Sequence, residues 1–400
     1  MDIKRLKSVA FAMAAGLALG AAQLPALAQG HGRGDIQVPD TSIEGPFDRG
    51  FVSHTNHLIL LNPAKGLGPG GGMTPAQMQT FYALPTTGGQ GVIAIVDAYD
   101  YPAALSDFNT FSKQFGLPRE TSSNALASSN KVFQVVYQGG TKPRSNTGWA
   151  QEAALDIEWA HAMAPGATIV LVEAQSSSFA DLFAAVDIAA KIVGVKQVSM
   201  SWGGSEYSGE MSSDIHFNVN GICFFAASGD SGGKTIYPST SPYVVAVGGT
   251  SVATTSAGGF LGETGWSGGG GGNSPYESKP SWQSGVGGSN RSVPDISSNA
   301  DPNTGVSVYG PTGRGTNSGW LVFGGTSVSA PCMAGMVNLG GGTYTSTFSL
   351  LTNIYSHYNS SLASSFFRDI TVGNNGFKCT AGWDYVTGVG SPQGTGGFRP

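Results

Sequence analysis

A serine that follows paired glycines is the strongest chemical signal in the chain. The segment Phe323-Gly-Gly-Thr-Ser-Val-Ser-Ala-Pro331 places Ser327 directly before an apolar stretch. Glycines let the backbone turn tightly before a helix, and the partial positive charge of a helix N-terminus favours negative charge that develops there. Ser327 is therefore the candidate nucleophile. The alternative is that Ser327 or Thr326 only caps the helix, as such residues usually do.

Two carboxylates on one predicted helix could activate this serine. Glu152 and Asp156 are four positions apart, so a helix carries both on one face, where like charges make one of them hold a proton more readily. A serine hydroxyl needs a base, so Glu152 would act as general base and then as general acid, while Asp156 orients it and shares its proton. The alternative is a solvated acidic face, but the neighbouring Ala, Leu, Ile and Trp residues are too apolar for one. Glu158 lies off this face and is predicted to be solvated.

The serine motif and the Glu-x-x-x-Asp helix resemble those of the sedolisins, the serine-carboxyl branch of the subtilisin-like peptidases. A subtilase would supply a His-Gly-Thr motif, and none of the six histidines has that context. The resemblance implies an aspartic acid at the oxyanion site, which Asp230 in Ser-Gly-Asp-Ser-Gly matches. A carboxyl group donates a hydrogen bond only when it is protonated, which favours acidic pH. The alternative is that Asp230 is an ordinary turn residue.

The resemblance thus implies a serine-type endopeptidase that is active at acidic pH on protein or peptide substrates. Its acyl-enzyme would form on Ser327, with Glu152 and Asp156 as the acid–base pair and Asp230 at the oxyanion. A tripeptidyl-releasing exopeptidase would use the same residues. Two alternatives are a subtilase-type Ser-His-Asp peptidase that uses Asp97, and a catalytically silent secreted binding protein on the same scaffold.

The resemblance also implies one structural calcium site near the C-terminus. Asp369 and Asp384 would supply carboxylates, and Ile370, Thr380 and Gly382 would supply main-chain carbonyls. Calcium prefers such hard oxygen ligands. The family usually has glycine where this chain has Thr380, whose carbonyl can still serve. The alternative is a pair of aspartates in turns.

Short β-rich runs alternate with amphipathic stretches, which predicts an α/β fold with a mostly parallel central sheet and helices on both faces. The resemblance makes this fold subtilisin-like. Residues 250–316, rich in glycine and serine, are expected to form long surface loops. The predicted strands cover residues 91–97, 168–173, 197–202, 222–228 and 243–247, and the predicted helices cover 103–115, 150–164 and 179–191.

The first residues indicate export. Lys4, Arg5 and Lys7 precede an apolar stretch that ends in the cleavage pattern Ala26-Leu-Ala28, so residues 1–28 are predicted to be a signal peptide. The apolar stretch is too short for a membrane anchor. We expect a secreted monomer, extracellular or periplasmic, without a membrane anchor.

Domain organisation follows from composition. Residues 29–75, rich in glycine, proline and polar residues, are expected to be an extended lead-in segment with little packing of its own. Residues 76–400 are expected to form the peptidase domain. Sedolisins usually carry a large N-terminal prodomain, for which residues 29–75 are too short, so its roles in folding and latency cannot be carried over.

The charge balance and the cysteines add two further expectations. Only 11% of the residues are charged and the formal net charge is −5, so no basic stripe supports binding to nucleic acid. Of the three cysteines, Cys223 lies in an apolar run. An oxidising compartment would therefore leave Cys332–Cys379 as the candidate disulfide.

Overall fold

The structure is a computed structural model that describes residues 36–63, 67–313 and 317–400. The predicted signal peptide, residues 1–28, lies outside these ranges. The described residues fall within one compact unit. Within them, no helix combines the length and the apolar character needed to cross a membrane.

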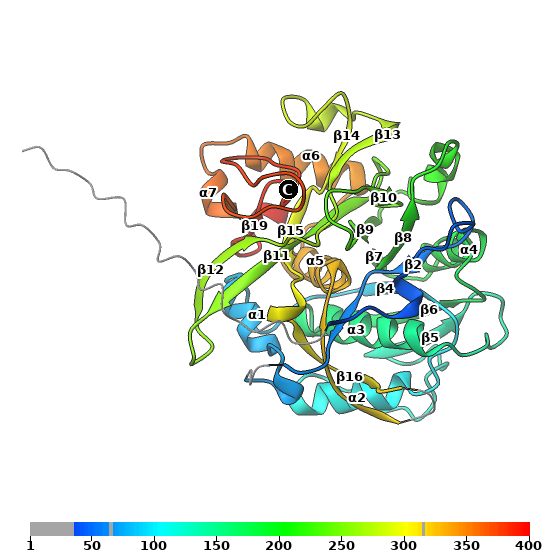
Figure 1. Cartoon of the computed structure of the whole chain (residues 1–400). Helices are drawn as coiled ribbons and strands as arrows, with labels where there is room; N and C mark the ends of the chain where they lie inside the picture. Colours follow the sequence, from blue (N-terminus) through cyan, green and yellow to red (C-terminus); the bar gives the residue numbers. More distant parts are fainter. Residues whose placement is uncertain (1–35, 64–66, 314–316) are drawn as a thin grey trace, which may run out of the picture. The chain divides into compact units, whose positions relative to one another are not determined.

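An eight-stranded sheet forms the centre of this unit (Figure 1). All its neighbouring strands pair in parallel except one pair, in which the edge strand β12 runs antiparallel to β11. The strand order is β12-β11-β9-β7-β4-β6-β5, and β15 also pairs with β11. Its members are β4 (Val92–Ala98), β5 (Phe133–Tyr137), β6 (Thr168–Ala174), β7 (Val195–Met200), β9 (Cys223–Ala227), β11 (Val245–Thr254), β12 (Phe260–Gly265) and β15 (Ile296–Asn299).

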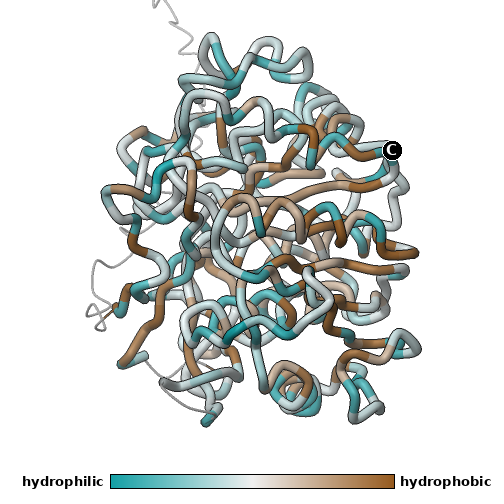
Figure 2. The backbone as a smooth tube through the Cα atoms, turned by 90° about the vertical axis from the view of Figure 1, so that its right-hand side faces the viewer, coloured by the Kyte–Doolittle hydropathy of each residue, from teal (hydrophilic) through white to brown (hydrophobic). Residues whose placement is uncertain are grey.

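Helices cover both faces of the sheet, as predicted. Along β4, Ile93 and Ile95 face a core shared with α2 (Ala104–Phe115), α3 (Thr147–Met163) and α5 (Thr326–Gly340). The alternate residues Ala94 and Val96 face a second core with α4 (Phe179–Ala189). This alternation follows from the two-residue period of a strand, and both faces are apolar because both are buried. Figure 2 shows hydrophobic stretches crossing the middle of the molecule, with others nearer its edge.

The Gly/Ser-rich region is not a set of loops, so that expectation is wrong. It contributes β12, β15 and three further strands, β13 (Gly272–Ser278), β14 (Asn290–Val293) and β16 (Val306–Pro311). Glycine there allows backbones to approach closely, because a Cβ at Gly270 would collide with the Ser228 carbonyl and one at Gly271 with the Tyr385 carbonyl. The composition that suggested surface loops therefore reflects tight packing.

The lead-in segment packs well, so the expectation of little packing is wrong for residues 53–60. Its strands β1 (Ile36–Gln37) and β3 (Leu58–Leu60) form a sheet with β16 and β17 (Ser318–Gly324) in the order β1-β3-β17-β16. Strand β2 (His54–Thr55) joins β8 (Trp202–Ser205) and β10 (Ile236–Tyr237) in a second small sheet. Strands of two or three residues carry little sequence pattern, so they depend on these distant partners.

The remaining elements surround this framework. They are α1 (Pro75–Phe81), α6 (Thr347–Tyr358), α7 (Ala363–Phe366), β18 (Phe367–Arg368), β19 (Ser391–Pro392), and the 3-10 helices η1 (Asp40–Ser42), η2 (Pro69–Gly71), η3 (Glu210–His216), η4 (Ser281–Gln283), η5 (Pro302–Thr304) and η6 (Gly396–Phe398).

The predicted disulfide is absent. Cys223, Cys332 and Cys379 are all buried free thiols. Cys332 lies on α5 in the core beside the central sheet, whereas Cys379 packs in a separate small cluster with Ile370. The pairing Cys332–Cys379 is therefore wrong.

Candidate active site

The start of α5 meets the middle of α3, and this contact brings together the predicted nucleophile and base (Figure 1). Helix α5 begins after Gly325, whose φ of +98° suits glycine, and Ser327 lies in its first turn. The Ser327 hydroxyl donates to the Ser201 carbonyl oxygen at 3.2 Å, and it lies close enough to Glu152 to lower the pKa of that carboxyl group against the effect of burial. The structure thus places the predicted nucleophile beside the predicted base.

Helix α3 is buried on nearly every side, so its carboxyl groups are shielded from water. Glu152 and Asp156 are both fully buried. Ser201 Oγ donates to Asp156 Oδ1 at 2.8 Å, which fixes the orientation of that carboxyl group. Burial raises the pKa of both groups above their usual range, and the charge of Glu152 adds to the shift at Asp156. Such a pair retains a proton that it can share.

Asp97, which the sequence offered only for the subtilase alternative, lies next to this carboxyl pair. It lies near the end of β4 and is 1% exposed, and neither of its carboxyl oxygens has a hydrogen-bond partner among the described residues. Burial raises its pKa well above the usual range, and the charges of Asp156 and Glu152 raise it further. Three carboxyl groups therefore share one dry region behind Ser327.

Asp230 approaches the nucleophile from the turn after β9. Its Oδ1 accepts hydrogen bonds from the Thr326 N–H and the Thr326 hydroxyl, both at 2.8 Å. Its Oδ2 has no hydrogen-bond partner among the described residues. Burial raises the pKa of Asp230 to about 7. Below that pH the free oxygen carries a proton and is a hydrogen-bond donor.

The backbone carbonyl oxygen of Asn56 lies near both Ser327 and Asp230. The Ser327 N–H donates to the Asn56 carbonyl oxygen at 3.0 Å. A Cβ added at Gly325 would collide both with this oxygen and with Asp230 Oδ2, so the two oxygens face the same small space. Two donors aimed at one carbonyl oxygen form the kind of site that stabilises an oxyanion, once Asp230 is protonated.

His57 is a site residue that sequence reasoning missed. It is fully buried, and its Nδ1 lies 3.0 Å from Glu152 Oε2. Burial lowers its pKa to about 4, and the charge of Asp230 opposes this shift. A Ser-His-Asp mechanism would need a histidine against Ser327, whereas the contact of His57 is with Glu152. No local sequence motif predicts the role of His57, because it is buried only through the pairing of its segment with strands that are distant in the sequence.

Two further titratable residues of α3, Glu158 and His161, are also buried. Glu158 is fully buried and accepts a hydrogen bond from the Tyr309 N–H at 3.0 Å, so the prediction that it is solvated is wrong. His161, near the helix end, is also buried and lies 2.9 Å from the Pro118 carbonyl oxygen through Nε2. Both serve packing between α3 and neighbouring segments.

The five predicted calcium ligands lie around one loop. Gly382 N–H donates to Asp369 Oδ2 at 3.0 Å, and Thr380 N–H donates to Asp384 Oδ2 at 2.9 Å. Ile370, beside Asp369, is buried in the small cluster under this loop. The oxygen-only donor set, with two carboxylates tied to the same loop, fits the chemistry of calcium. Within the described ranges, no group of three or more His, Cys, Asp or Glu residues is arranged to hold a metal ion.

Comparisons with known proteins show which family the chain resembles. The model of the Subtilase family matches residues 135–341. Kumamolisin from Bacillus sp. (strain MN-32) is 34% identical over 310 residues, which cover 67% of this chain and 54% of kumamolisin. Sedolisin from Pseudomonas sp. (strain 101) is 38% identical over 206 residues, 43% of this chain and 34% of sedolisin. The chain thus spans about half, or less, of the length of these relatives.

A solved structure gives the same result for the fold. Pseudomonas sedolisin, a serine-carboxyl proteinase complexed with two molecules of pseudo-iodotyrostatin, superposes with a TM-score of 0.68 at 28% sequence identity. The match covers 82% of this chain and 96% of that one. The subtilisin-like α/β fold predicted from the sequence is confirmed.

Proposed function

This chain belongs to the subtilase family, in its sedolisin branch, and we propose that it is a serine-carboxyl endopeptidase that works at acidic pH. One observation carries the proposal. The Ser327 side chain lies beside the buried carboxyl group of Glu152, whose pKa it lowers, while the Ser327 N–H and the free oxygen of Asp230 face a single peptide carbonyl.

The arrangement supports acyl transfer through Ser327. In the state of the pair that holds a single proton, on Asp156, the ionised Glu152 takes the hydroxyl proton as Ser327 Oγ attacks the substrate carbonyl, and later gives a proton to the leaving amine. Asp156, fixed by Ser201, shares its proton with Glu152. The Ser327 N–H and protonated Asp230 donate to the oxyanion. Water then hydrolyses the acyl-enzyme with Glu152 again as the base.

The length of the occupied cleft supports endopeptidase rather than tripeptidyl-peptidase activity. Upstream of the Asn56 carbonyl, β2 pairs with β8, and farther back Ser53 N–H donates to the Ser177 carbonyl while Val52 bridges to Ser178. Five consecutive residues, 52–56, therefore have backbone partners on this side. A binding site closed after three residues would leave Val52 and Ser53 without such partners.

Cellular location and partners follow from the sequence. Residues 1–28 have the features of a signal peptide, so we place the protein outside the cytoplasm, in the extracellular space or the periplasm. We expect a monomer that acts on protein or peptide substrates.

Degradation of an acid-denatured protein between about pH 3 and pH 8 tests this function. We expect cleavage that is confined to acidic and near-neutral pH and falls by about 10³-fold or more in Ser327→Ala, because the nucleophile is lost. Ser329→Ala is the matched control, since Ser329 lies on the same helix but donates to the Ser298 carbonyl. Activity that is highest at the alkaline end of this range, or that survives Ser327→Ala, would overturn the proposal.

We also propose that the loop at residues 380–384, together with residues 369–370, holds one structural calcium ion. Asp369 and Asp384 would bind it through carboxylates, and Ile370, Thr380 and Gly382 through carbonyls. The ion would cross-link residues 369–370 to the loop at 380–384 and would take no part in the reaction.

Chelation tests the calcium site without measuring activity. Calcium at about 100 times its dissociation constant should raise Tm by roughly 3 to 4 °C relative to protein treated with EGTA. Asp369→Asn should remove most of this calcium-dependent difference, and the same concentration of magnesium should reproduce little of it. An identical Tm with calcium and with EGTA would show that the two aspartates serve only the loop's own hydrogen bonds.

A further inference from the structure

Four further acidic side chains gather where η3 and β13 meet the end of β8. Glu206 directly follows β8, Glu210 and Asp214 lie on η3, and Glu277 lies on β13. Each of the four residues is at most 8% exposed. The segment that follows β8 and strand β13 therefore meet through carboxyl groups that are shielded from water.

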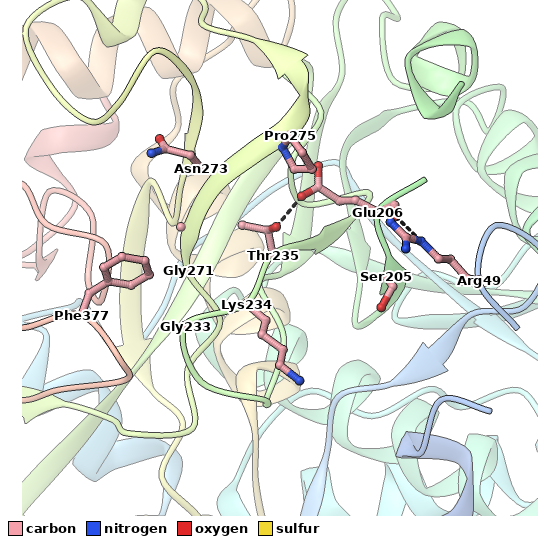
Figure 3. A pocket seen from close by; sticks show the side chains of 11 residues that line it. Arg49, Ser205, Glu206, Gly233, Lys234, Thr235, Gly271, Asn273, Pro275 and Phe377 are labelled. Carbon is pink, nitrogen blue, oxygen red and sulfur yellow. Dashed lines mark hydrogen bonds between the residues drawn. The ribbon is translucent and has the colours of Figure 1, made fainter. Parts of the chain in front are cut away.

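Glu206 connects three of the surrounding segments. Its Oε1 accepts a hydrogen bond from the Thr235 hydroxyl, directly before β10, and its Oε2 accepts one from the Ser274 hydroxyl on β13. Figure 3 shows Thr235 on one side of Glu206 and Arg49 on the other, along a cavity of about 340 Å³. Arg49 Nε donates to the backbone carbonyl oxygen of Glu206 at 2.6 Å. The carboxyl oxygens of Glu206 thus have neutral hydroxyl partners.

Two of the other carboxyl groups leave a buried oxygen without a partner. Glu210 Oε2 accepts from the Tyr207 N–H at 2.7 Å, and Asp214 Oδ1 accepts from the Tyr237 hydroxyl at 3.1 Å. Glu210 Oε1 and Glu277 Oε1 are buried without a hydrogen-bond partner among the described residues. An ionised carboxylate in such a place has lost water without gaining a donor, so these groups favour the protonated form.

Burial and mutual repulsion keep protons on these groups. Burial raises the pKa of Glu210 to about 10 and that of Glu277 to about 8, and the charge of Glu206 raises both further. Burial also raises the pKa of Asp214. Arg291 lowers the pKa of Glu277, but its guanidinium is bonded to Asp295 at 2.6 and 2.8 Å. Other titratable side chains on the surrounding segments are Tyr207, Tyr237, Tyr276, Arg49, Lys234 and His216, which pairs with Asp187 at 2.9 Å.

We propose that these four carboxyl groups form an acid clasp, which holds η3 and β13 against the end of β8 while it is protonated and loosens as its groups ionise. Loss of the protons places like charges side by side in a dry region. Because Glu206 directly follows β8, the loosening reaches the strand that pairs with β2. The acid clasp concerns stability and does not depend on the proposed reaction.

The raised pKa values fix the direction of the effect. In the unfolded chain these carboxyl groups ionise near pH 4. In the folded chain Glu277 ionises near pH 8 and Glu210 near pH 10. The folded state therefore binds more protons between these limits. The contribution of the acid clasp to stability is complete below about pH 4 and is lost as the pH rises toward the folded values.

Melting temperatures at about pH 4 and about pH 8 test the acid clasp. All proteins carry Ser327→Ala, so that digestion does not affect the measurement. Glu210→Gln keeps an acceptor for the Tyr207 N–H, and its amide can donate to a neighbouring carboxylate at every pH. We expect Tm to lie within about 1 °C of the parent protein at the lower pH and roughly 3 °C above it at the higher pH.

A second variant and a control keep the result specific. Glu277→Gln repeats the test from β13 and should show the same pH-dependent gain. Glu120→Gln removes an equal charge from a carboxylate that accepts the N–H groups of Lys131 and Val132, both at 2.9 Å. Burial opposes ionisation of Glu120, but such backbone hydrogen bonds lower its pKa to about 2, so this control should lower Tm at both pH values. The inference fails if neither Glu210→Gln nor Glu277→Gln gains on the parent between the two pH values.

Hydrogen exchange locates the change within the chain. Protection of the η3 and β13 amides, corrected for the intrinsic pH dependence of exchange, should fall by about tenfold relative to β4 and β6 between about pH 5 and pH 8. Glu210→Gln should reduce this fall. Equal protection ratios at the two pH values would place the loss of stability elsewhere and overturn the acid clasp.

Discussion

Replacement of Glu152 by glutamine should lower the turnover of a denatured protein at about pH 4 by 10³- to 10⁴-fold. Glutamine has nearly the same size and can still accept the hydrogen bond that the Asn56 N–H donates to Glu152 Oε2 at 3.1 Å. Its amide cannot take the proton of Ser327, so the loss should appear in kcat and not in substrate binding. Initial rates over a range of substrate concentrations separate the two.

Glu158→Gln is a matched control for this experiment. Glu158 is also a fully buried glutamate of α3, but its carboxyl group bonds to the Tyr309 N–H, a contact that glutamine can keep. We expect activity within about threefold of wild type. Similar losses in both variants, with a lowered Tm, would point to damage of the helix. Near-normal activity of Glu152→Gln would show that Glu152 is not the base. His57, whose Nδ1 lies 3.0 Å from Glu152 Oε2, would then be the next candidate.

The proposed catalytic residues could be predicted from the sequence because each depends on a local pattern. Four-residue spacing on one helix brings Glu152 and Asp156 together, and the glycines before Ser327 predict a turn into a helix. The structure adds a third carboxyl group that the spacing of residues along the sequence cannot predict. Asp97 comes from another strand, and only the fold brings its carboxyl group to the same dry region.

The lead-in segment was missed for the opposite reason. Residues 53–57 are polar and show no apolar alternation, yet they are buried between β8 and the start of α5. Their partners lie far away in the sequence, and the pairing satisfies backbone groups of both strands. Glu158 was misjudged in the same way, because the strand that covers it, β16, came from a region expected to be loops.

The protonation state of Asp230 should set the upper pH limit of activity. The donor form is the protonated one, and burial raises the pKa of Asp230 to about 7, so the donor is present at acidic pH and lost as the pH rises through that value. The charges that face Asp230 are those of Glu152, which favours the protonated form, and His57, which opposes it. Wild-type kcat/KM should therefore fall near neutral pH.

Two substitutions of Asp230, by asparagine and by alanine, separate the effect of the hydrogen-bond donor from the effect of the titratable charge. In Asp230→Asn the side-chain oxygen can still accept from the Thr326 N–H and hydroxyl, while its N–H₂ donates to the oxyanion at every pH. We expect Asp230→Asn to retain activity at about pH 4 and to extend it above pH 7, whereas Asp230→Ala should lose roughly 10²- to 10³-fold throughout. The measurement is kcat/KM for a peptide substrate across this range. If Asp230→Asn falls at the same pH as wild type, Asp230 does not set the limit, which then belongs to the other buried titratable groups of the site, Glu152 with Asp156, Asp97 and His57.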